Sequence, residues 1–279
     1  MLTTIFLDFD KTITNSRKEI TLRTRAAIKQ VQVKGYRVGL CTGRQLISLR
    51  SRLSLLEFFS ANQTHIFSGG AQIITTVGEI IWQKLIAATT VKQIFEQANL
   101  NDVVLTSSTV SFNANQACVV GNNKQTLEDF AKRHHLIKKE LILTQSYNQQ
   151  LPLVIVDEIN EQFLQFLEKN KLELNFKTML GYDGTVYADI TAKDVNKGNA
   201  LEVWSRLNET PLTEIAMVGD SENDLEALQV VGYPIIMGNA TDALTKFGFH
   251  QIDTNDNDGL AFWLESLPVI NGASGNKND

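Results

Sequence analysis

The sequence has little of what would stabilise a small secreted protein or span a membrane. Only two of its 279 residues are cysteines, Cys41 and Cys118, so no disulfide framework is expected and a cytoplasmic location is the simplest interpretation. No apolar run approaches the length needed to cross a bilayer, and no basic segment followed by an apolar one indicates a secretory leader. The net charge of -5, without a basic stripe, argues against nucleic acid as a partner.

Several catalytic motifs are missing as well. The chain has no Walker phosphate loop, no G-x-S-x-G elbow, no H-E-x-x-H motif and no paired C-x-x-C. Its histidines show no metal-ligand spacing, so we expect them at the surface or, with satisfied hydrogen bonds, in the core: His65, His134, His135 and His250. With 43% hydrophobic and 20% charged residues, the chain has the composition of a soluble globular protein and the length for two domains.

An apolar run near the start of the chain leads directly into two carboxylates. Residues 3–7 are β-branched or apolar, and Asp8 and Asp10 follow them two positions apart. Such a run predicts a buried parallel strand that ends in Asp8 and Asp10, and open α/β sheets carry their chemistry at the carboxyl ends of such strands. On an extended backbone the two side chains would point the same way, and their repulsion would require a cation or a proton. Two solvated acids that cap a strand are the alternative.

A second acidic stretch lies near the other end of the chain. Residues 214–219 again predict a buried strand, and a helix begins just after Asp220. Asp220, Asn223 and Asp224 are spaced i, i+3 and i+4, so they share the face of the first turn. Metal binding and helix capping account equally well for this spacing, since Asp and Asn are common at helix starts.

Two further polar groups follow predicted core elements. A helical pattern over residues 19–34 and a strand over 36–41 form a βαβ unit that brings Thr42 and Gly43 to the sheet edge where Asp8 lies. A hydroxyl and a glycine there suit a phosphate group, although a simple turn is the alternative. Lys197 follows Asn196, a typical helix N-cap, and a lysine at that place is ordinarily solvated.

Taken together, these stretches resemble the haloacid dehalogenase (HAD) superfamily, specifically its Cof-like type IIB phosphatases. The family's four motifs occur in order as Asp8-Phe9-Asp10-Lys11-Thr12, Thr42-Gly43-Arg44, Lys197-Gly198 and Gly219-Asp220-Ser221-Glu222-Asn223-Asp224. Two departures stand out. Relatives usually have Gly where this chain has Lys11, and Asn where it has Gly69. Lys11 could shift substrate preference or simply face solvent, and Gly69 cannot make the polar contact that an Asn side chain would make.

The resemblance implies an α/β fold, a Rossmann-like parallel sheet core with an inserted α+β cap domain. We predict a discontinuous core over residues 1–82 and 188–279, and a cap of the C2B type over 83–187 that selects the substrate. Within the core a helix is expected over 45–59. In the cap we expect helices over 90–99, 125–134 and 160–170, and strands over 103–105, 117–120, 153–156, 174–179 and 185–190. Candidate substrate contacts in the cap are Asn148, Tyr182 and Asp183.

The resemblance also implies the chemistry, which is hydrolysis of small phosphorylated metabolites such as sugar phosphates. Asp8 would attack phosphorus to form an aspartyl-phosphate, and Asp10 would act as acid and then as base. Mg²⁺ would be held by Asp8, the backbone carbonyl of Asp10 and Asp220, with Asp224 supporting them. Phosphate would be bound by Thr42, Gly43, Lys197 and Asn223.

Two other functions on the same fold stay open. The chain could be a catalytically silent regulator that binds phosphorylated metabolites, or a phosphotransferase that passes the phosphoryl group to a second substrate. A small phosphorylated metabolite is the expected partner in each case, without nucleic acid or membrane. The sequence does not distinguish a monomer from a homodimer.

Overall fold

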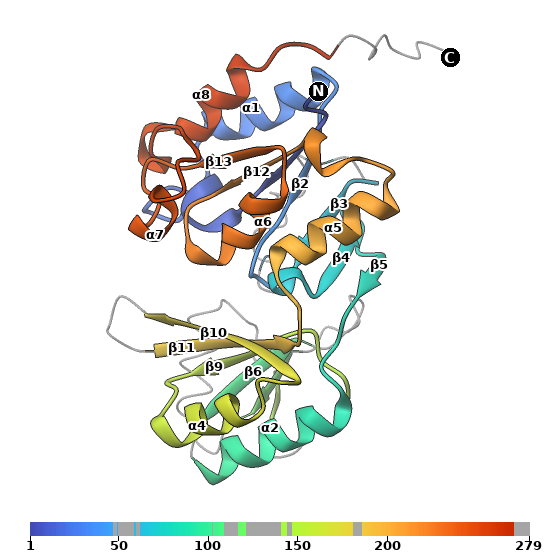
Figure 1. The fold of residues 1–279 in the computed structure, drawn as a ribbon, viewed down its shortest axis with the longest axis vertical. Coiled ribbons are helices and arrows are strands. Elements are labelled where there is room, and N and C mark those ends of the chain that lie inside the picture. The colour runs from blue at the N-terminus through green and yellow to red at the C-terminus, as the bar shows by residue number, and fades with distance from the viewer. Residues whose placement is uncertain are drawn as a thin grey trace. The chain divides into compact units, whose positions relative to one another are not determined.

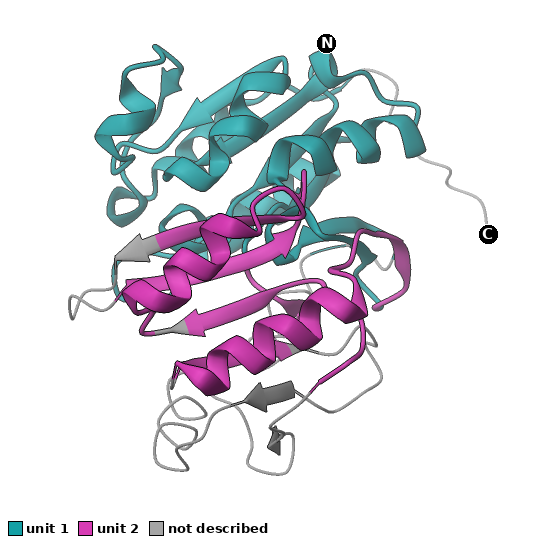
Figure 2. Ribbon diagram, turned by 60° about the horizontal axis from the view of Figure 1, so that its bottom comes forward, with its two compact units in different colours: residues 1–43, 54–77, 196–279 teal, residues 44–53, 78–195 magenta. Residues whose placement is uncertain are grey.

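The structure is a computed structural model that describes residues 1–46, 49, 59, 62–101, 103–108, 117–120, 141–143, 147–180 and 186–270. The chain divides into two compact units, residues 1–43, 54–77 and 196–279, and residues 44–53 and 78–195 (Figure 2). The predicted helix over 125–134 lies outside the described residues, as does most of the predicted helix over 45–59. Among the described residues, no helix has both the length and the apolar character of a membrane span.

Unit 1 is built on a five-stranded parallel sheet with the strand order β14-β13-β12-β1-β2. The strands are β1 (Thr4–Leu7), β2 (Arg37–Leu40), β12 (Ile215–Gly219), β13 (Tyr233–Ile236) and β14 (His250–Gln251). The helices are α1 (Leu22–Val33), α5 (Lys197–Leu207), α6 (Leu225–Val230), α7 (Asp242–Thr245) and α8 (Gly259–Ser266) (Figure 1). This confirms the predicted α/β fold with a parallel sheet core.

The central strands of this sheet are buried along their whole length. Every residue of β1 and of β12 is buried, which is why both read as continuous apolar runs rather than alternating ones. In register, Leu7 of β1 pairs with Val218 of β12 and with Leu40 of β2. The three strands therefore end side by side, and the residues that follow them share one edge of the sheet.

Local interactions place the N-terminus of α5 near that edge. The side chain of Asn196 accepts a hydrogen bond from the backbone N–H of Asn199 at 2.7 Å, which confirms the predicted N-cap. Farther along the helix, Trp204 packs edge-on against Phe6 of β1, with ring centroids 5.0 Å apart. Its indole N–H donates to the hydroxyl of Thr64 at 2.6 Å. Lys197 therefore begins a helix whose position is set by the core.

A β-hairpin extends unit 1 beyond the parallel sheet. Strand β3 (Thr64–Phe67) pairs antiparallel with β4 (Gln72–Thr75). The next strand in the chain, β5 (Ile80–Gln83), belongs to unit 2. The turn Ser68–Gly70 joins β3 to β4. Cys41, the residue after β2, forms a parallel bridge with Ile66 of β3. The hairpin therefore continues the edge that β2 begins.

Unit 2 is an α+β unit with a six-stranded sheet of order β10-β11-β9-β6-β7-β8. Its strands are β6 (Val104–Ser108), β7 (Ala117–Val120), β8 (Leu141–Leu143), β9 (Val154–Asp157), β10 (Leu174–Leu180) and β11 (Val186–Ala192). Helices α2 (Ala88–Leu100) and α4 (Glu161–Lys169) cover one face of the sheet (Figure 1). All five predicted strands and these two helices are confirmed as elements, whereas the three-residue β8 was not predicted.

His65 on β3 is the buried core histidine that the sequence allowed for. Its Nδ1 accepts a hydrogen bond from the N–H of Leu40 at 3.1 Å. The proton therefore sits on Nε2, which donates to the hydroxyl of Thr76 at 2.9 Å. Burial lowers the His65 pKa to about 3. The ring is neutral in the folded protein at neutral pH.

This burial predicts a specific acid sensitivity of the fold. Below pH 6.5 the unfolded chain binds a proton at His65 that the folded protein does not bind. Stability contributed by the neutral ring is therefore present above about pH 6.5 and falls by about 1.4 kcal/mol per pH unit down to about pH 3. Urea unfolding from pH 7 to pH 4.5 should show a flatter pH dependence in His65→Gln than in the wild type. The exposed His250→Gln is the control, and equal slopes for wild type and His65→Gln would contradict the assignment.

Candidate active site

The end of β1 carries Asp8 into a tight turn. Asp8 is buried, with 5% of its surface exposed, and its N–H donates to the carbonyl of Val218 on β12 at 2.9 Å. Residues Phe9–Ile13 then form a tight turn in which Asp10 is extended and Lys11 is left-handed, with a φ of 55°. The strand ends at Leu7, so the prediction that it extends through Asp8 and Asp10 was wrong. Because the two residues lie beyond the strand, the alternation of side chains along a strand does not determine whether the half-buried Asp10 points the same way as Asp8.

The end of β12 carries Asp220 into a capped helical turn. The carboxylate of Asp224 turns back and accepts hydrogen bonds from the N–H groups of Asp220 at 3.0 Å and Ser221 at 3.1 Å. These two contacts are those of a helix cap, one of the two interpretations left open above. On the other side, the hydroxyl of Thr12 donates to Oδ1 of Asp220 at 3.4 Å. Asp224 therefore helps to fix the backbone from which the Asp220 side chain projects.

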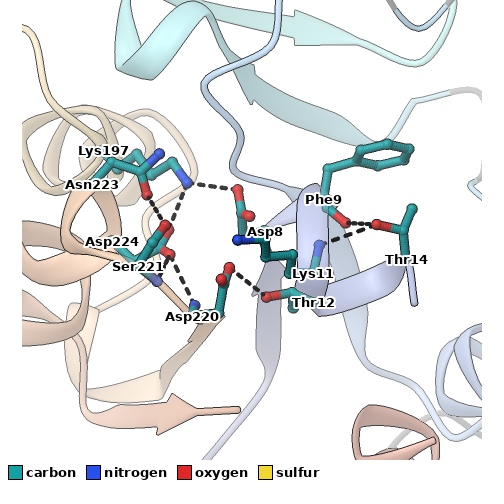
Figure 3. Close-up of polar contacts among 10 residues, drawn as sticks. All are labelled: Asp8, Phe9, Lys11, Thr12, Thr14, Lys197, Asp220, Ser221, Asn223 and Asp224. Carbon is teal, nitrogen blue, oxygen red and sulfur yellow. Dashed lines mark hydrogen bonds and ion pairs between the residues drawn. The ribbon is translucent and has the colours of Figure 1, made fainter. Parts of the chain in front are cut away.

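Lys197 joins the two acidic stretches. Its Nζ lies 2.6 Å from Oδ1 of Asp8 and 2.5 Å from Oδ1 of Asp224 (Figure 3). Only 1% of the Lys197 side chain is exposed, whereas lysines are almost never fully buried unless they are paired. A residue that would ordinarily be solvated is therefore part of a buried ion-pair network.

Three carboxylates of this network meet in one place. Asp8, Asp220 and Asp224 each offer an oxygen, and these oxygens lie within 4.8 Å of one another. Asp10, whose backbone carbonyl was the predicted ligand, contributes no carboxylate to this group. The three carboxylates outnumber the one ammonium group, that of Lys197, so the cluster has room for further positive charge. Carboxylate oxygens are also the ligands that hard divalent cations prefer. The residues present therefore fit such a cation.

Electrostatics of the cluster agree with this interpretation. Burial and the neighbouring acids Asp224 and Asp220 raise the pKa of Asp8 against the attraction of Lys197. Burial, followed by repulsion from Asp224, raises the pKa of Asp220 to about 7. Burial alone would lower the pKa of Lys197, but the attraction of Asp224 and Asp8 outweighs it and the pKa is raised. Lys197 is thus held as a cation among acids that resist ionisation together.

The remaining predicted site residues lie around this cluster. Thr42 is buried, and its N–H donates to the carbonyl of Ile66 at 2.9 Å while its carbonyl accepts from Gly69 N–H at 3.2 Å. Gly43 follows it and is half-buried. Asn223 accepts a hydrogen bond from the hydroxyl of Ser221 at 3.0 Å. Their roles toward phosphate stay predictions, because these contacts are all within the protein.

Lys11 and Gly69, the two departures from the family pattern, share one backbone conformation. Lys11 has a φ of 55° and Gly69 a φ of 66°, so both positions are left-handed. Gly and Asn adopt this conformation most readily among the amino acids, which accounts for the Gly and Asn that relatives usually have. A Cβ at Gly69 would meet nothing within 4 Å. Lys11 is therefore a non-glycine residue held in a left-handed conformation directly after Asp10.

Sequence reasoning assigned no role to several residues that contact the site. Thr12 and Ser221 stand inside the quoted motifs, but only the folded backbone shows that they bond to Asp220 and Asn223. Cys41 is buried beside the cluster, and burial raises the pKa of its thiol, which makes it a poor nucleophile. In unit 2, Asn148 is exposed, whereas Tyr182 and Asp183 lie outside the described residues.

Comparisons with known proteins agree with the geometry. The model of the haloacid dehalogenase-like hydrolase family matches residues 5–264. The 5-amino-6-(5-phospho-D-ribitylamino)uracil phosphatase YcsE of Bacillus subtilis is 26% identical over 261 residues, 92% of each chain. Phosphatase YwpJ of the same organism is 24% identical, over 94% of this chain and 99% of its own. Among solved structures, the HAD subclass IIB sugar phosphatase BT4131 has a TM-score of 0.77 at 19% identity, covering 94% of this chain and 98% of its own.

A parallel sheet that gathers carboxylates and a buried lysine at the ends of its strands defines an α/β enzyme core suited to an anionic substrate. The family match identifies that enzyme class further. The chain belongs to the haloacid dehalogenase-like hydrolase family, and the resemblance drawn from the four motifs is confirmed. Phosphatase activity on small phosphorylated molecules is the function that the family and its curated relatives support.

Proposed function

We propose that this hydrolase is a Mg²⁺-dependent phosphatase that transfers the phosphoryl group of small metabolites to Asp8 and then to water. The observation that carries the proposal is the meeting of Asp8, Asp220 and Asp224 within 4.8 Å, with Lys197 bonded to two of them. These residues come from distant parts of the sequence, and each is buried. Buried charge gathered at the end of parallel strands is costly for folding and is typical of a catalytic centre.

Each side chain has a defined task in the proposed reaction. Lys197 holds one oxygen of Asp8, which orients this carboxylate for attack on phosphorus. As the new P–O bond forms, the bond to the leaving oxygen breaks, and Asp10 donates a proton to that oxygen. Water then attacks phosphorus while Asp10 takes its proton, the bond to Asp8 breaks, and inorganic phosphate leaves. Thr42, the amides after it and Lys197 bind the transferring oxygens.

Asp8 and Asp220 would hold a divalent cation, with Asp224 as support. When bound, Mg²⁺ would supply positive charge that reduces the repulsion between the nucleophile and a dianionic phosphate ester. The choice of Mg²⁺ rests on the all-oxygen donor set, since softer metals prefer nitrogen and sulfur ligands. Lys197 alone cannot take this part, because it already neutralises two carboxylates.

Removal of the metal is the first test. EDTA should lower phosphate release from p-nitrophenyl phosphate at least about 100-fold, and excess Mg²⁺ should restore it. EDTA saturated with Mg²⁺ beforehand is the control. Undiminished release after dialysis against EDTA would contradict the proposal. A silent regulator would bind the phosphate ester and release nothing, and a phosphotransferase would give a new phosphate ester when an alcohol acceptor is added.

The names of the curated relatives support a proposal for the substrate class. YcsE and YwtE of Bacillus subtilis are both named as 5-amino-6-(5-phospho-D-ribitylamino)uracil phosphatases, and BT4131 is titled a sugar phosphatase. We therefore propose phosphate esters of primary alcohols on sugars and polyols as substrates. We also propose residues 83–187 as the cap that selects among them. A panel of sugar and polyol phosphates, assayed for phosphate release, tests this choice.

A further inference from the structure

The loop after β13 contacts the turn that carries Asp10. Asn239 lies in this loop, and its Nδ2 donates a hydrogen bond to the backbone carbonyl of Lys11 at 3.0 Å. Its Oδ1 accepts from the N–H of Asn255 at 2.9 Å. Asn239 thus links three segments that are far apart in sequence, and none of the functions assigned above uses it.

Close backbone packing brings these segments together. A Cβ at Gly238 would lie only 2.8 Å from the backbone nitrogen of Thr254, so this position has no room for a side chain. The N–H of Gly238 donates to the carbonyl of Asp253 at 3.2 Å. The loop that contains Asn239 therefore packs against the loop that contains Asn255 through backbone contacts. These contacts hold the backbone of Asn239 in place.

The turn that Asn239 holds needs external support. Lys11 is left-handed with a φ of 55°, a conformation that is unfavourable for a non-glycine residue. The N–H of Lys11 donates to the hydroxyl of Thr14 at 3.1 Å, and the carbonyl of Thr14 accepts from Nδ2 of Asn255 at 2.9 Å. Hydrogen bonds from the two asparagines therefore restrain both Lys11 and Thr14, and Asp10 is the residue directly before Lys11.

We propose that Asn239 is a positioning residue for protonation of the leaving group, because its bond to the Lys11 carbonyl sets where the carboxyl group of Asp10 lies. This inference rests on the proposed function, in which Asp10 donates that proton as the P–O bond breaks. Asn255 supports the same turn through Thr14. Asp8 is held independently by β1 and Lys197, so the nucleophile should keep its place when Asn239 is changed.

Leaving groups of different basicity separate this role from a merely structural one. A sugar alkoxide is strongly basic and needs a proton as it departs, whereas p-nitrophenolate departs with little help. The ratio kcat/KM covers only the steps up to the first irreversible one, here the transfer of the phosphoryl group to Asp8. A misplaced Asp10 should therefore slow one substrate selectively, while general damage to the site slows both.

The experiment compares kcat/KM for D-ribose 5-phosphate and p-nitrophenyl phosphate, with Mg²⁺, in the wild type, Asn239→Ala and Asn257→Ala. Asn257 is the matched control, since its side chain bonds to Asp253 in the same loop and not to the Asp10 turn. In Asn239→Ala we expect about a 10–100-fold loss for D-ribose 5-phosphate and less than about a threefold loss for p-nitrophenyl phosphate. Asn257→Ala should match the wild type on both.

Each other outcome overturns the inference. Equal losses of kcat/KM on the two substrates would mean that Asn239 only stabilises the site in general. No loss on either substrate would mean that Asn239 does not position Asp10. If Asn239→Ala does not fold, Asn239→Asp gives the same test, because it keeps the acceptor for Asn255 and lacks the donor to Lys11. If the wild type releases phosphate from neither substrate, the proposed function itself is wrong. This result is distinguishable from a failure of the inference about Asn239 because it is seen in the wild type, before any variant is assayed.

Discussion

Asp8→Asn should abolish phosphate release, with kcat/KM at least about 10⁴-fold below that of the wild type. The amide is nearly the same size as the carboxylate, but it lacks the negative oxygen that would attack phosphorus. Lys197 would keep its second partner, Asp224, at 2.5 Å, so the packing around the site should persist. The measurement is phosphate release from p-nitrophenyl phosphate at saturating Mg²⁺.

The fold of the Asp8→Asn protein has to be checked beside its activity. Asp242→Asn is a control for the chemistry of the substitution, since Asp242 is exposed on α7, and it should keep full activity. Thermal unfolding of both variants shows whether lost activity reflects lost structure. Asp8→Asn that folds and retains more than about 1% of the wild-type rate would rule out Asp8 as the nucleophile.

Lys197→Met should cost the metal-free protein about 3–5 kcal/mol of its free energy of unfolding, because it leaves Asp8 and Asp224 buried without their cation. Methionine matches the length of the lysine stem, so the change removes charge and leaves the volume nearly intact. Catalysis should fall as well, by about 10²–10³-fold in kcat/KM, since Lys197 both orients Asp8 and binds phosphate. Urea unfolding in EDTA and steady-state kinetics measure the two effects.

The exposed Lys193→Met offers the same substitution four residues earlier in the chain. It should change stability by less than about 0.5 kcal/mol. The penalty in Lys197→Met should also shrink as the pH falls. The pKa of Asp8 is raised, so in the variant this carboxyl takes up a proton before the chain unfolds. A penalty below about 1 kcal/mol at pH 7 would show that the buried ion pairs contribute little.

Much of the core could be predicted because its strands are apolar without interruption. β1 and β12 are buried on both faces, and a continuous apolar run is typical of strands in a parallel sheet covered on both sides. Once the strands are aligned, Asp8 and Asp220 must follow them at one edge. Lys197 could be placed because Asn196 caps the helix that it begins. The parts of the site predicted best are those attached directly to the ends of regular elements.

The turns between elements were beyond reach of such patterns. Asp10 was expected to continue the strand, but a left-handed Lys11 bends the chain into a tight turn, and nothing in the apolar periodicity signals this conformation. Asn239 reaches the same turn through a hydrogen bond across 228 positions of sequence. Such long-range contacts depend on how loops dock, which a single sequence does not specify.

The central claim is that Asp8 takes the phosphoryl group from the substrate. Rapid acid quench of the enzyme during turnover of a radiolabelled phosphate ester, followed by peptide mapping, tests it most directly. The account predicts label on the peptide that contains Asp8, removable by hydroxylamine as expected for an acyl phosphate, and no label in Asp8→Asn. Active enzyme that carries label on another residue, or that turns over without any labelled protein, would contradict it.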